Sequence, residues 1–347
     1  MALALSLGRR GMGRVWPNPA VGCVLVRDGV IIGRGRTADG GRPHAETEAL
    51  AQAGDATGAT AYVTLEPCAH HGQTPPCAAA LIAAKVARVV IATRDPDPRT
   101  AGKGIAMLQA AGIAVDVGCM QAEADEDHAG FFLKVTKKRP YLTLKLATTL
   151  DGRIATHTGH SQWITGPQAR RAVHAMRARH DAVMVGAGTV RADDPMLNVR
   201  GMGDVPQPVR VVLSSDLDLP DDLQIAATAH VQPVWLCHKS HADPQHWQSR
   251  GAKTFANDPR DLAGVMAMLS DQGITRVFCE GGGSLGASLL KAGLVDELIV
   301  FTAGCAIGAD GTPSLQALGV HEMSAAPRFQ LAEVRQIGPD ILHRWRS

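Results

Sequence analysis

Four side chains in the first quarter of the chain have the types and spacing needed to act together on a metal ion. His44 and Glu46 lie in the stretch PHAE, and Cys68 and Cys77 bracket the polar stretch AHHGQTPP. A catalytic zinc takes three nitrogen or sulfur ligands and leaves a fourth position to water, whose pKa it lowers toward neutrality. His44, Cys68 and Cys77 supply such a set. Glu46 is close enough to carry a proton between that water and a substrate nitrogen.

The residues around the two cysteines suggest how the chain positions them. Cys68 follows Pro67, and Cys77 follows Pro75 and Pro76. Proline is favoured in the first turn of a helix, and a helix N-terminus stabilises the thiolate that binds metal. We therefore expect both cysteines to begin helices.

The order H-A-E followed by P-C and a second cysteine is typical of zinc-dependent deaminases. Those enzymes usually space the cysteines as C-x-x-C, whereas eight residues separate Cys68 from Cys77. A metal site accommodates this insert if Cys68 and Cys77, at its two ends, lie next to each other in the fold. The insert is then available to the substrate, and we expect His70, His71 and Thr74 to contact substrate and not metal.

Other zinc or cysteine chemistry fits less well. A structural zinc needs a fourth ligand, for which only His70 or His71 stands at suitable spacing. A redox pair is disfavoured by the long spacing, and a zinc peptidase by the absence of H-E-x-x-H. A non-enzymatic, zinc-stabilised binding module remains an alternative, as does a deaminase acting on a nucleoside or a nucleic-acid base with a second half that only binds.

Length and composition set the frame for this site. The chain has 347 residues, which suits two domains. The charged segment VTKKRP ends at Pro140 and predicts the boundary, with domains at 1–139 and 140–347. The formal net charge of +2 gives no basic patch for nucleic acid.

The same features predict a soluble, cytoplasmic protein. The apolar run in MALALSLGRR is short and precedes its arginines, unlike a signal peptide, and no apolar stretch approaches membrane-helix length. Seven scattered cysteines do not form a disulfide framework. The oligomeric state is left open, and a homo-oligomer is compatible with the sequence.

Both halves alternate between strand and helix patterns. In the first half, β-branched runs at 21–26, 61–65 and 88–93 predict strands, and alanine-rich segments at 45–54, 77–86 and 104–113 predict helices. The second half begins with YLTLKLATT, where the leucines alternate with Thr143, Lys145 and Ala147, and strand and helix patterns then alternate to residue 301. The sequence predicts an α/β fold for each half.

A second site is indicated in RVFCEGGGSLGASLL, which predicts a strand, a glycine loop and a helix. Gly281, Gly283 and Gly286 satisfy G-x-G-x-x-G, a pattern whose amides bind phosphate but which also occurs in plain turns. Most strands of this half precede the loop, which argues against a Rossmann domain. Ser214 and Ser215 after another strand would not repel a ribose 2′-phosphate, a mild indication of NADP.

The chain resembles a known family over nearly its whole length. PNPAVGCVLV (17–26), PHAE (43–46), YVTLEPCAHHGQTPPC (62–77) and DPDPRTAGKG (95–104) are similar to the deaminase half of the bifunctional riboflavin-biosynthesis deaminase/reductases, in which the long insert between the cysteines is typical. LKLATTLDG (144–152), SQWITG (161–166), DAVMVGAGTVRADDPMLNVR (181–200) and EGGGSLGASLL (280–290) resemble its reductase half.

This resemblance implies a cytidine-deaminase-like three-layer α/β/α domain, followed by a dihydrofolate-reductase-like α/β domain that uses NADPH. It implies substrate contacts at Ser161, Arg177, Leu197, Arg200 and Glu280. It implies NADPH contacts at Ala147, Trp163, Thr189, Asp193, a serine at 214 or 215, Gly282, Gly283, Ser284, Leu285, Gly286, Ala287 and Ser288.

Physical chemistry is compatible with these roles. Arg177 and Arg200 suit a phosphorylated sugar, since a guanidinium binds phosphate through paired hydrogen bonds. Lys145, on the polar side of its strand, would polarise or protonate the reacting sugar, with Asp151 orienting it. Without the resemblance, Arg177 would be a residue of a solvated helix face and Trp163 a core residue.

Three stretches depart from the family pattern. Thr149 stands where the family usually has serine, AGCAIG (303–308) replaces a proline-containing segment, and Thr37 stands where a histidine is common. The predicted function is hydrolytic deamination of the phosphorylated pyrimidine 2,5-diamino-6-ribosylamino-4(3H)-pyrimidinone 5′-phosphate at zinc, followed by NADPH reduction of its ribosyl group to ribityl. The substrate follows from the resemblance, and the zinc chemistry from the residues.

Overall fold

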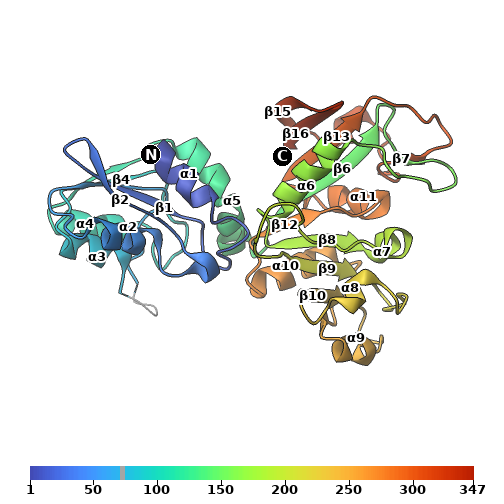
Figure 1. Cartoon of the computed structure of the whole chain (residues 1–347), viewed down its shortest axis with the longest axis horizontal. Helices are drawn as coiled ribbons and strands as arrows, with labels where there is room; N and C mark the ends of the chain where they lie inside the picture. The colour runs from blue at the N-terminus through green and yellow to red at the C-terminus, as the bar shows by residue number, and fades with distance from the viewer. Residues whose placement is uncertain (71–74) are drawn as a thin grey trace. The chain divides into compact units, whose positions relative to one another are not determined.

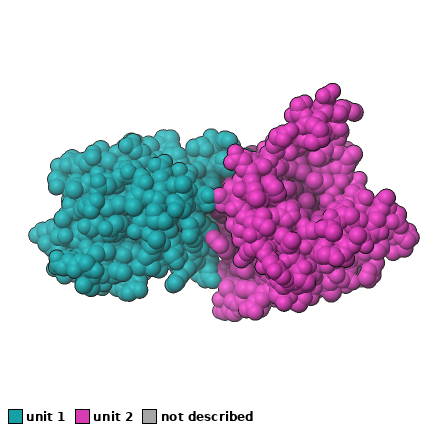
Figure 2. Space-filling view, turned by 90° about the horizontal axis from the view of Figure 1, so that it is seen from above, with its two compact units in different colours: residues 1–140, 273–275 teal, residues 141–272, 276–347 magenta. Residues whose placement is uncertain are grey.

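The computed structural model describes residues 1–70 and 75–347, which form two compact units (Figure 2). Unit 1 contains residues 1–140 and 273–275, and unit 2 contains residues 141–272 and 276–347. Each unit has its own buried core of aliphatic side chains. Each is therefore described by itself.

Unit 1 is built on a five-stranded sheet with the order β2-β1-β3-β4-β5. The strands β1, β2 and β3 pair antiparallel, and β3, β4 and β5 pair parallel. The strands are β1 (Gly22–Arg27), β2 (Val30–Arg36), β3 (Thr60–Val63), β4 (Arg88–Ile91) and β5 (Ala114–Val117). The helices are α1 (Ala2–Arg9), α2 (Ala45–Ala53), α3 (Cys77–Ala83), α4 (Lys103–Ala110) and α5 (Gln121–Lys137), with a 3₁₀ turn at Asp39–Gly41.

The helices cover both faces of this sheet, with α1 and α5 on one face and α2, α3 and α4 on the other (Figure 1). Close packing places α2 on the β1–β2 hairpin. A Cβ atom at Gly33 would lie 2.2 Å from the carbonyl oxygen of Ala49, and one at Gly35 would lie 2.3 Å from that of Ala45. Only glycine permits this approach. The start of α2, and with it the PHAE stretch, is thereby fixed against the sheet.

Unit 2 is built on a nine-stranded sheet with the order β11-β10-β9-β8-β12-β6-β13-β16-β15, which is parallel from β11 to β13. The strands β13, β16 and β15 pair antiparallel. The strands are β6 (Tyr141–Thr149), β8 (Ala182–Gly186), β9 (Val209–Leu213), β10 (Val234–Cys237), β11 (Lys253–Phe255), β12 (Arg276–Cys279), β13 (Glu297–Ala303), β15 (Gln330–Ile337) and β16 (Asp340–Arg346).

The remaining elements of unit 2 connect these strands (Figure 1). A small second sheet pairs β7 (Arg153–Ala155) with β14 (Thr312–Pro313). The helices are α6 (Pro167–Arg177), α7 (Ala187–Asp193), α8 (Gln224–Ala227), α9 (Gln245–Ser249), α10 (Leu262–Asp271) and α11 (Gly283–Lys291), with a 3₁₀ turn at Met323–Ala325.

The predicted strands and helices of both halves are present in the structure. The leucines of β6 at 142, 144 and 146 are buried, and Lys145 and Ala147 on the other side are half-buried. The glycine loop joins β12 to α11 after most strands of the unit, as expected for a fold other than Rossmann. The sequence did not indicate the C-terminal hairpin β15–β16. Among the residues that the structure describes, no helix is both long and apolar enough to span a bilayer.

Candidate active sites

The predicted metal ligands of unit 1 converge on one point. The ligand atoms of His44, Cys68 and Cys77 all lie within 4.8 Å of one another. His44 Nδ1 is 3.3 Å from the sulfur of Cys77 and 3.8 Å from that of Cys68. Ligands on a tetrahedral zinc, at about 2.1 Å for nitrogen and 2.3 Å for sulfur, lie about 3.6 Å apart. The separations and the donor types therefore fit zinc.

Only one of the two cysteines begins a helix, so the expectation for Cys68 was wrong. Cys77 is the first residue of α3, whereas Cys68 lies in an irregular segment after β3. The insert lies between Cys68 and the start of α3 at Cys77. The backbone N–H of Cys77 donates to the sulfur of Cys68 at 3.3 Å, so Cys68 still uses the start of α3.

The two thiols shift each other's pKa in opposite directions. The hydrogen bond from Cys77 lowers the pKa of Cys68 to about 4, with help from His44. The same hydrogen bond, together with burial, raises the pKa of Cys77. A metal ion that binds both sulfurs needs both as thiolates, so its binding would release the proton of Cys77.

Glu46 lies beside this group in the first turn of α2, and its side chain is buried. Burial raises the pKa of its carboxyl, and the negative charge of Cys68 adds to the effect. Glu46 and His44 both line a cavity of about 120 Å³. A carboxyl that holds a proton readily, on the wall of a small cavity, is suited to proton transfer.

The rest of this cavity comes from segments that the motif does not contain. His70, from the insert, is on the wall, whereas His71 and Thr74 lie outside the described residues. Thr37, one of the departures from the family pattern, is buried there and bonds Pro19 O and Val21 N, both at 3.0 Å. The sequence analysis assigned no role to several further lining residues. They are Asn18, Arg42, Glu66, Asp95, Asp97, Arg99 and Thr100.

The centre of the unit 2 site is a buried charge cluster. Arg177, the last residue of α6, donates two parallel hydrogen bonds to the carboxylate of Glu280. Lys145 Nζ lies 3.9 Å from the same carboxylate. Burial acts to raise the pKa of Glu280, but the charges of Arg177 and Lys145 hold it below its usual value. Burial lowers the pKa of Lys145, against the charge of Glu280.

The parallel sheet explains why these residues meet. Strands β6 and β12 are neighbours, with Leu144 opposite Cys279, so Lys145 and Glu280 follow at adjacent positions. The N–H of Glu280 bonds Met184 O of β8 at 3.0 Å. Side chains at the carboxyl ends of parallel strands form a crevice that binds ligands.

This crevice is a cavity of about 450 Å³. It brings together all five predicted substrate contacts and four of the predicted NADPH contacts. They are Ser161, Arg177, Leu197, Arg200 and Glu280, and Ala147, Trp163, Thr189 and Asp193. Trp163 is 68% exposed and lies under the guanidinium of Arg170, so it is not a core residue.

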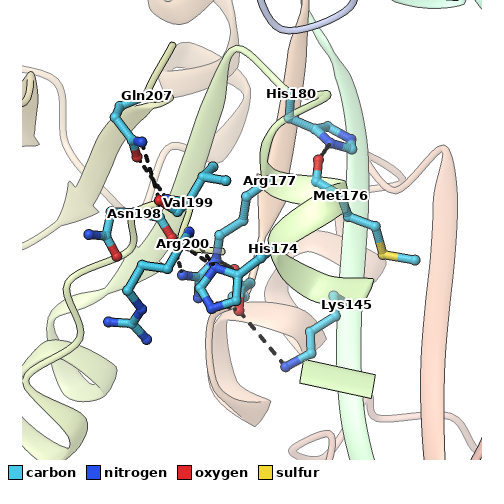
Figure 3. A network of polar contacts seen from close by, with 10 residues as sticks. Lys145, His174, Met176, Arg177, His180, Asn198, Val199, Arg200 and Gln207 are labelled. Atoms are coloured by element: carbon cyan, nitrogen blue, oxygen red, sulfur yellow. Dashed lines mark hydrogen bonds and ion pairs between the residues drawn. The ribbon is translucent and has the colours of Figure 1, made fainter. Parts of the chain in front are cut away.

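The two predicted phosphate-binding arginines differ. The guanidinium of Arg177 is occupied by Glu280 and by Asn198 O at 2.8 Å, whereas Arg200 is exposed. His174 lies between them, with Nδ1 at 3.2 Å from both Asn198 O and Arg200 N (Figure 3). No sequence pattern singled out His174, although it lies one helical turn before Arg177 on the same face of α6.

Fewer glycines of the loop are open to a phosphate than the G-x-G-x-x-G pattern indicated. A Cβ atom at Gly283 would lie 3.0 Å from Pro313 O, and one at Gly286 would lie 3.0 Å from Leu315, so packing explains these glycines. Gly282 is more open, since its Cβ would meet only the Thr189 hydroxyl at 3.5 Å. The open position at Gly282, next to cavity residue Thr189, fits one end of a dinucleotide. Ser214 is buried at the end of β9, and Ser288 bonds Ser284 O within α11.

Asp151 has partners other than Lys145. Its carboxylate accepts hydrogen bonds from the Thr149 hydroxyl and from the N–H groups of Ile307 and Gly308. These contacts lower the pKa of Asp151 to about 2, the Thr149 bond most of all. The charged groups that act on Lys145 are Glu280, Arg177 and Asp193. Asp151 thus fastens residues 307 and 308 to the turn after β6.

Comparison with known families finds a matching family model for each half of the chain. Residues 1–93 match the cytidine and deoxycytidylate deaminase zinc-binding region, and residues 140–343 match the RibD C-terminal domain. The chain is 43% identical to the riboflavin biosynthesis protein RibD of Escherichia coli K12, covering 98% of this chain and 96% of that protein. The chain belongs to the RibD family.

Solved structures of the RibD family have the same architecture. Acinetobacter baumannii RibD matches with a TM-score of 0.91 at 40% identity, over 99% of this chain and 97% of that one. A Thermotoga maritima diaminohydroxyphosphoribosylaminopyrimidine deaminase/5-amino-6-(5-phosphoribosylamino)uracil reductase matches with a TM-score of 0.90 at 36% identity, over 100% and 97% of the two chains. The predicted fold class, a deaminase domain followed by a reductase domain, is confirmed, as is the bifunctional zinc and NADPH enzyme of riboflavin biosynthesis.

Proposed function

We propose that unit 1 hydrolyses the exocyclic amine of 2,5-diamino-6-ribosylamino-4(3H)-pyrimidinone 5′-phosphate, and that unit 2 then reduces the ribosyl group of 5-amino-6-(5-phosphoribosylamino)uracil to ribityl. The observation that carries the first half is the convergence of His44, Cys68 and Cys77 beside buried Glu46. For the second half it is the Lys145–Glu280–Arg177 cluster on the cavity wall.

In the deamination, the bond between a ring carbon and its exocyclic nitrogen breaks, a bond from that carbon to the water oxygen forms, and ammonia leaves. His44, Cys68 and Cys77 would hold zinc, which supplies Lewis acidity toward water when it is bound. Glu46 takes a proton from the attacking water and delivers it to the departing nitrogen. Its burial suits proton transfer. A carboxyl whose pKa is raised by burial lies closer to neutral pH and can both accept and donate a proton.

In the reduction, C1′ of the ribosyl group gains a hydride, its bond to the ring oxygen of the sugar breaks, and that oxygen gains a proton. Ala147, Trp163, Thr189, Asp193 and the segment from Gly282 would hold NADPH, which supplies the reducing equivalents when it is bound. Lys145 donates the proton, since burial lowers its pKa and makes the ammonium a better acid. Glu280 and Arg177 fix the position of Lys145.

The same proposal assigns the substrate phosphate in unit 2 to Arg200, because the guanidinium of Arg177 is already paired. We assign Asp151 to anchoring the 303–308 segment and not to orienting Lys145. The domains are taken as residues 1–139 and 140–347. The working partner is a small phosphorylated pyrimidine and not nucleic acid, in the cytoplasm, and a homo-oligomer is compatible with it.

Metal analysis combined with an ammonia-release assay tests this proposal. The purified chain should carry about one zinc per molecule and release ammonia from the diaminopyrimidine phosphate without NADPH. Adding NADPH should give oxidation of the cofactor only after deamination. Full deaminase activity after removal of every transition metal would refute the zinc role. An NADPH titration that shows no binding of the cofactor would favour the alternative in which the second half is a binding module and not a reductase.

A further inference from the structure

Glu66 makes an unusual set of contacts close to the metal ligands. Its side chain is buried, two residues before Cys68. Its carboxylate accepts four backbone N–H groups. Oε1 accepts from Gly104 at 3.1 Å and Ile105 at 3.3 Å, and Oε2 accepts from Gly102 at 3.1 Å and Asp95 at 3.4 Å. An ionised carboxylate with this many donors is held firmly.

All four donors belong to the segment 95–105, which comprises the end of the connection after β4 and the first residues of α4. It approaches the Glu66–Pro67 backbone so closely that a Cβ atom at Gly104 would lie 2.0 Å from Pro67 O. Glu66 also accepts at the start of α4, where a negative charge is favourable. A single side chain thus joins the metal-ligating segment to the 95–105 segment.

The 95–105 segment forms one wall of the deaminase cavity through Asp95, Asp97, Arg99 and Thr100. The segment also makes contacts of its own and one contact to the insert. Arg99 pairs with Asp97 within the segment, and the Thr100 hydroxyl lies 3.4 Å from His70 Nδ1 of the insert. The four amides on Glu66 therefore set where this wall stands relative to Cys68.

We infer that Glu66 is a positioning residue of the deaminase site, which holds the 95–105 segment ready for substrate. This inference rests on the proposed deamination of the phosphorylated pyrimidine. A segment already ordered loses less conformational freedom on binding, so its anchor contributes mainly to substrate affinity. The zinc ligands and Glu46 are separate from this anchor and keep their own contacts.

Glu66→Gln tests the inference, because the new amide would point its N–H₂ group at two N–H donors. The KM for ammonia release should rise about tenfold, as for the loss of hydrogen bonds to a charged group, while kcat changes by less than about threefold. Zinc content should match the wild type. Amide hydrogen exchange in peptides covering 95–105 should accelerate. Glu123→Gln, the same change on the exposed face of α5, should alter none of these quantities.

Each outcome decides the inference. Unchanged exchange in 95–105 together with an unchanged KM would overturn it, and so would loss of zinc, which would make Glu66 a support of the metal site. If Glu66→Gln does not fold, Glu66→Asp keeps the charge but shortens the reach, and it should give faster exchange and a smaller rise in KM. If the wild type itself releases no ammonia, the proposed function fails, while the exchange comparison still decides whether Glu66 anchors the segment.

Discussion

In unit 1, the metal ligand His44 lies 24 residues before Cys68 and 33 residues before Cys77 along the chain. The two cysteines are separated only by the insert. In unit 2, Arg177 and Glu280 are 103 residues apart and meet only because β12 lies between β8 and β6 in the sheet. The first site is therefore largely local, and the second depends on the register of a whole sheet. Damage to one side chain should thus act differently in the two units, as the following predictions test.

The largest expected effect is that of Glu46→Gln. This change removes the proton carrier and leaves the three metal ligands in place. Ammonia release should fall by about 10⁴-fold with zinc content unchanged, whereas reduction of pre-deaminated substrate by NADPH should keep its wild-type rate. Metal analysis and the two separate assays measure these quantities. Loss of both activities together would contradict two independent sites.

Lys145→Ala should have the opposite effect. Without the proton donor, the rate of NADPH oxidation should fall by about 10³-fold, and ammonia release should not change. Steady-state assays of both reactions on one preparation compare them directly. A reductase rate equal to that of the wild type would remove Lys145 from the mechanism.

Arg177→Met tests how strongly unit 2 depends on its buried pair. Glu280 would keep its charge without its main partner, and breaking a buried pair costs about 3–5 kcal/mol of unfolding free energy. The displaced Glu280 and Lys145 should lower reductase turnover by about 10²-fold. Urea denaturation and NADPH oxidation measure the two effects. Arg171→Met, on the exposed face of the same helix, is the matched control and should change neither.

The smallest effect is the pH dependence contributed by His180. Burial lowers the pKa of this imidazole to about 3, and it bonds Thr143 Oγ1 at 3.1 Å and Met176 O at 2.8 Å. Between pH 6.5 and 3 the unfolded chain binds a proton at His180 that the folded chain does not, whereas above pH 6.5 neither state binds it. The contribution of His180 to the unfolding free energy is therefore fully present above pH 6.5. It falls by about 1.4 kcal/mol per unit as the pH drops below 6.5.

Urea denaturation of the full chain, followed by tryptophan fluorescence, measures this slope, since four of the five tryptophans lie in unit 2. His180→Gln should lower stability at pH 7 but reduce the slope between pH 6 and 4. His230→Gln, at an exposed position, should leave the slope as it is. An identical slope in wild type and His180→Gln would assign the pH dependence to other groups.

The two sites also differ in how much the sequence alone could predict. The donor types and spacing at His44, Cys68 and Cys77 were sufficient to predict the zinc site, because His44 directly precedes α2, Cys77 begins α3, and Cys68 lies in the segment between β3 and α3. The helix start at Cys68 was predicted wrongly, because a proline marks a first turn only where the chain can continue as helix. Glu66 gave no signal, since its four partners are backbone amides, which no residue pattern identifies.

In unit 2, periodicity correctly placed Lys145 on the polar side of β6, but the family resemblance was needed to assemble the rest. Neighbours along the chain were a poor guide to neighbours in space. Asp151, six residues beyond Lys145, is carried away by the turn after β6, whereas Glu280 reaches Lys145 through strand pairing. The partners of His174 could not be predicted either, because Asn198 and Arg200 are distant in sequence and lie in the connection between α7 and β9.

Two of the departures from the usual family sequence meet at Asp151. The hydroxyl of Thr149 and the amides of Ile307 and Gly308 share its carboxylate, and Leu150 N bonds Cys305 O at 2.7 Å. Residue 149 and the stretch 303–308 therefore form one interchangeable module. A chimera that carries residues 303–308 of another family member should also carry that protein's residue 149. Exchanging both together should restore the reductase activity that either exchange alone reduces.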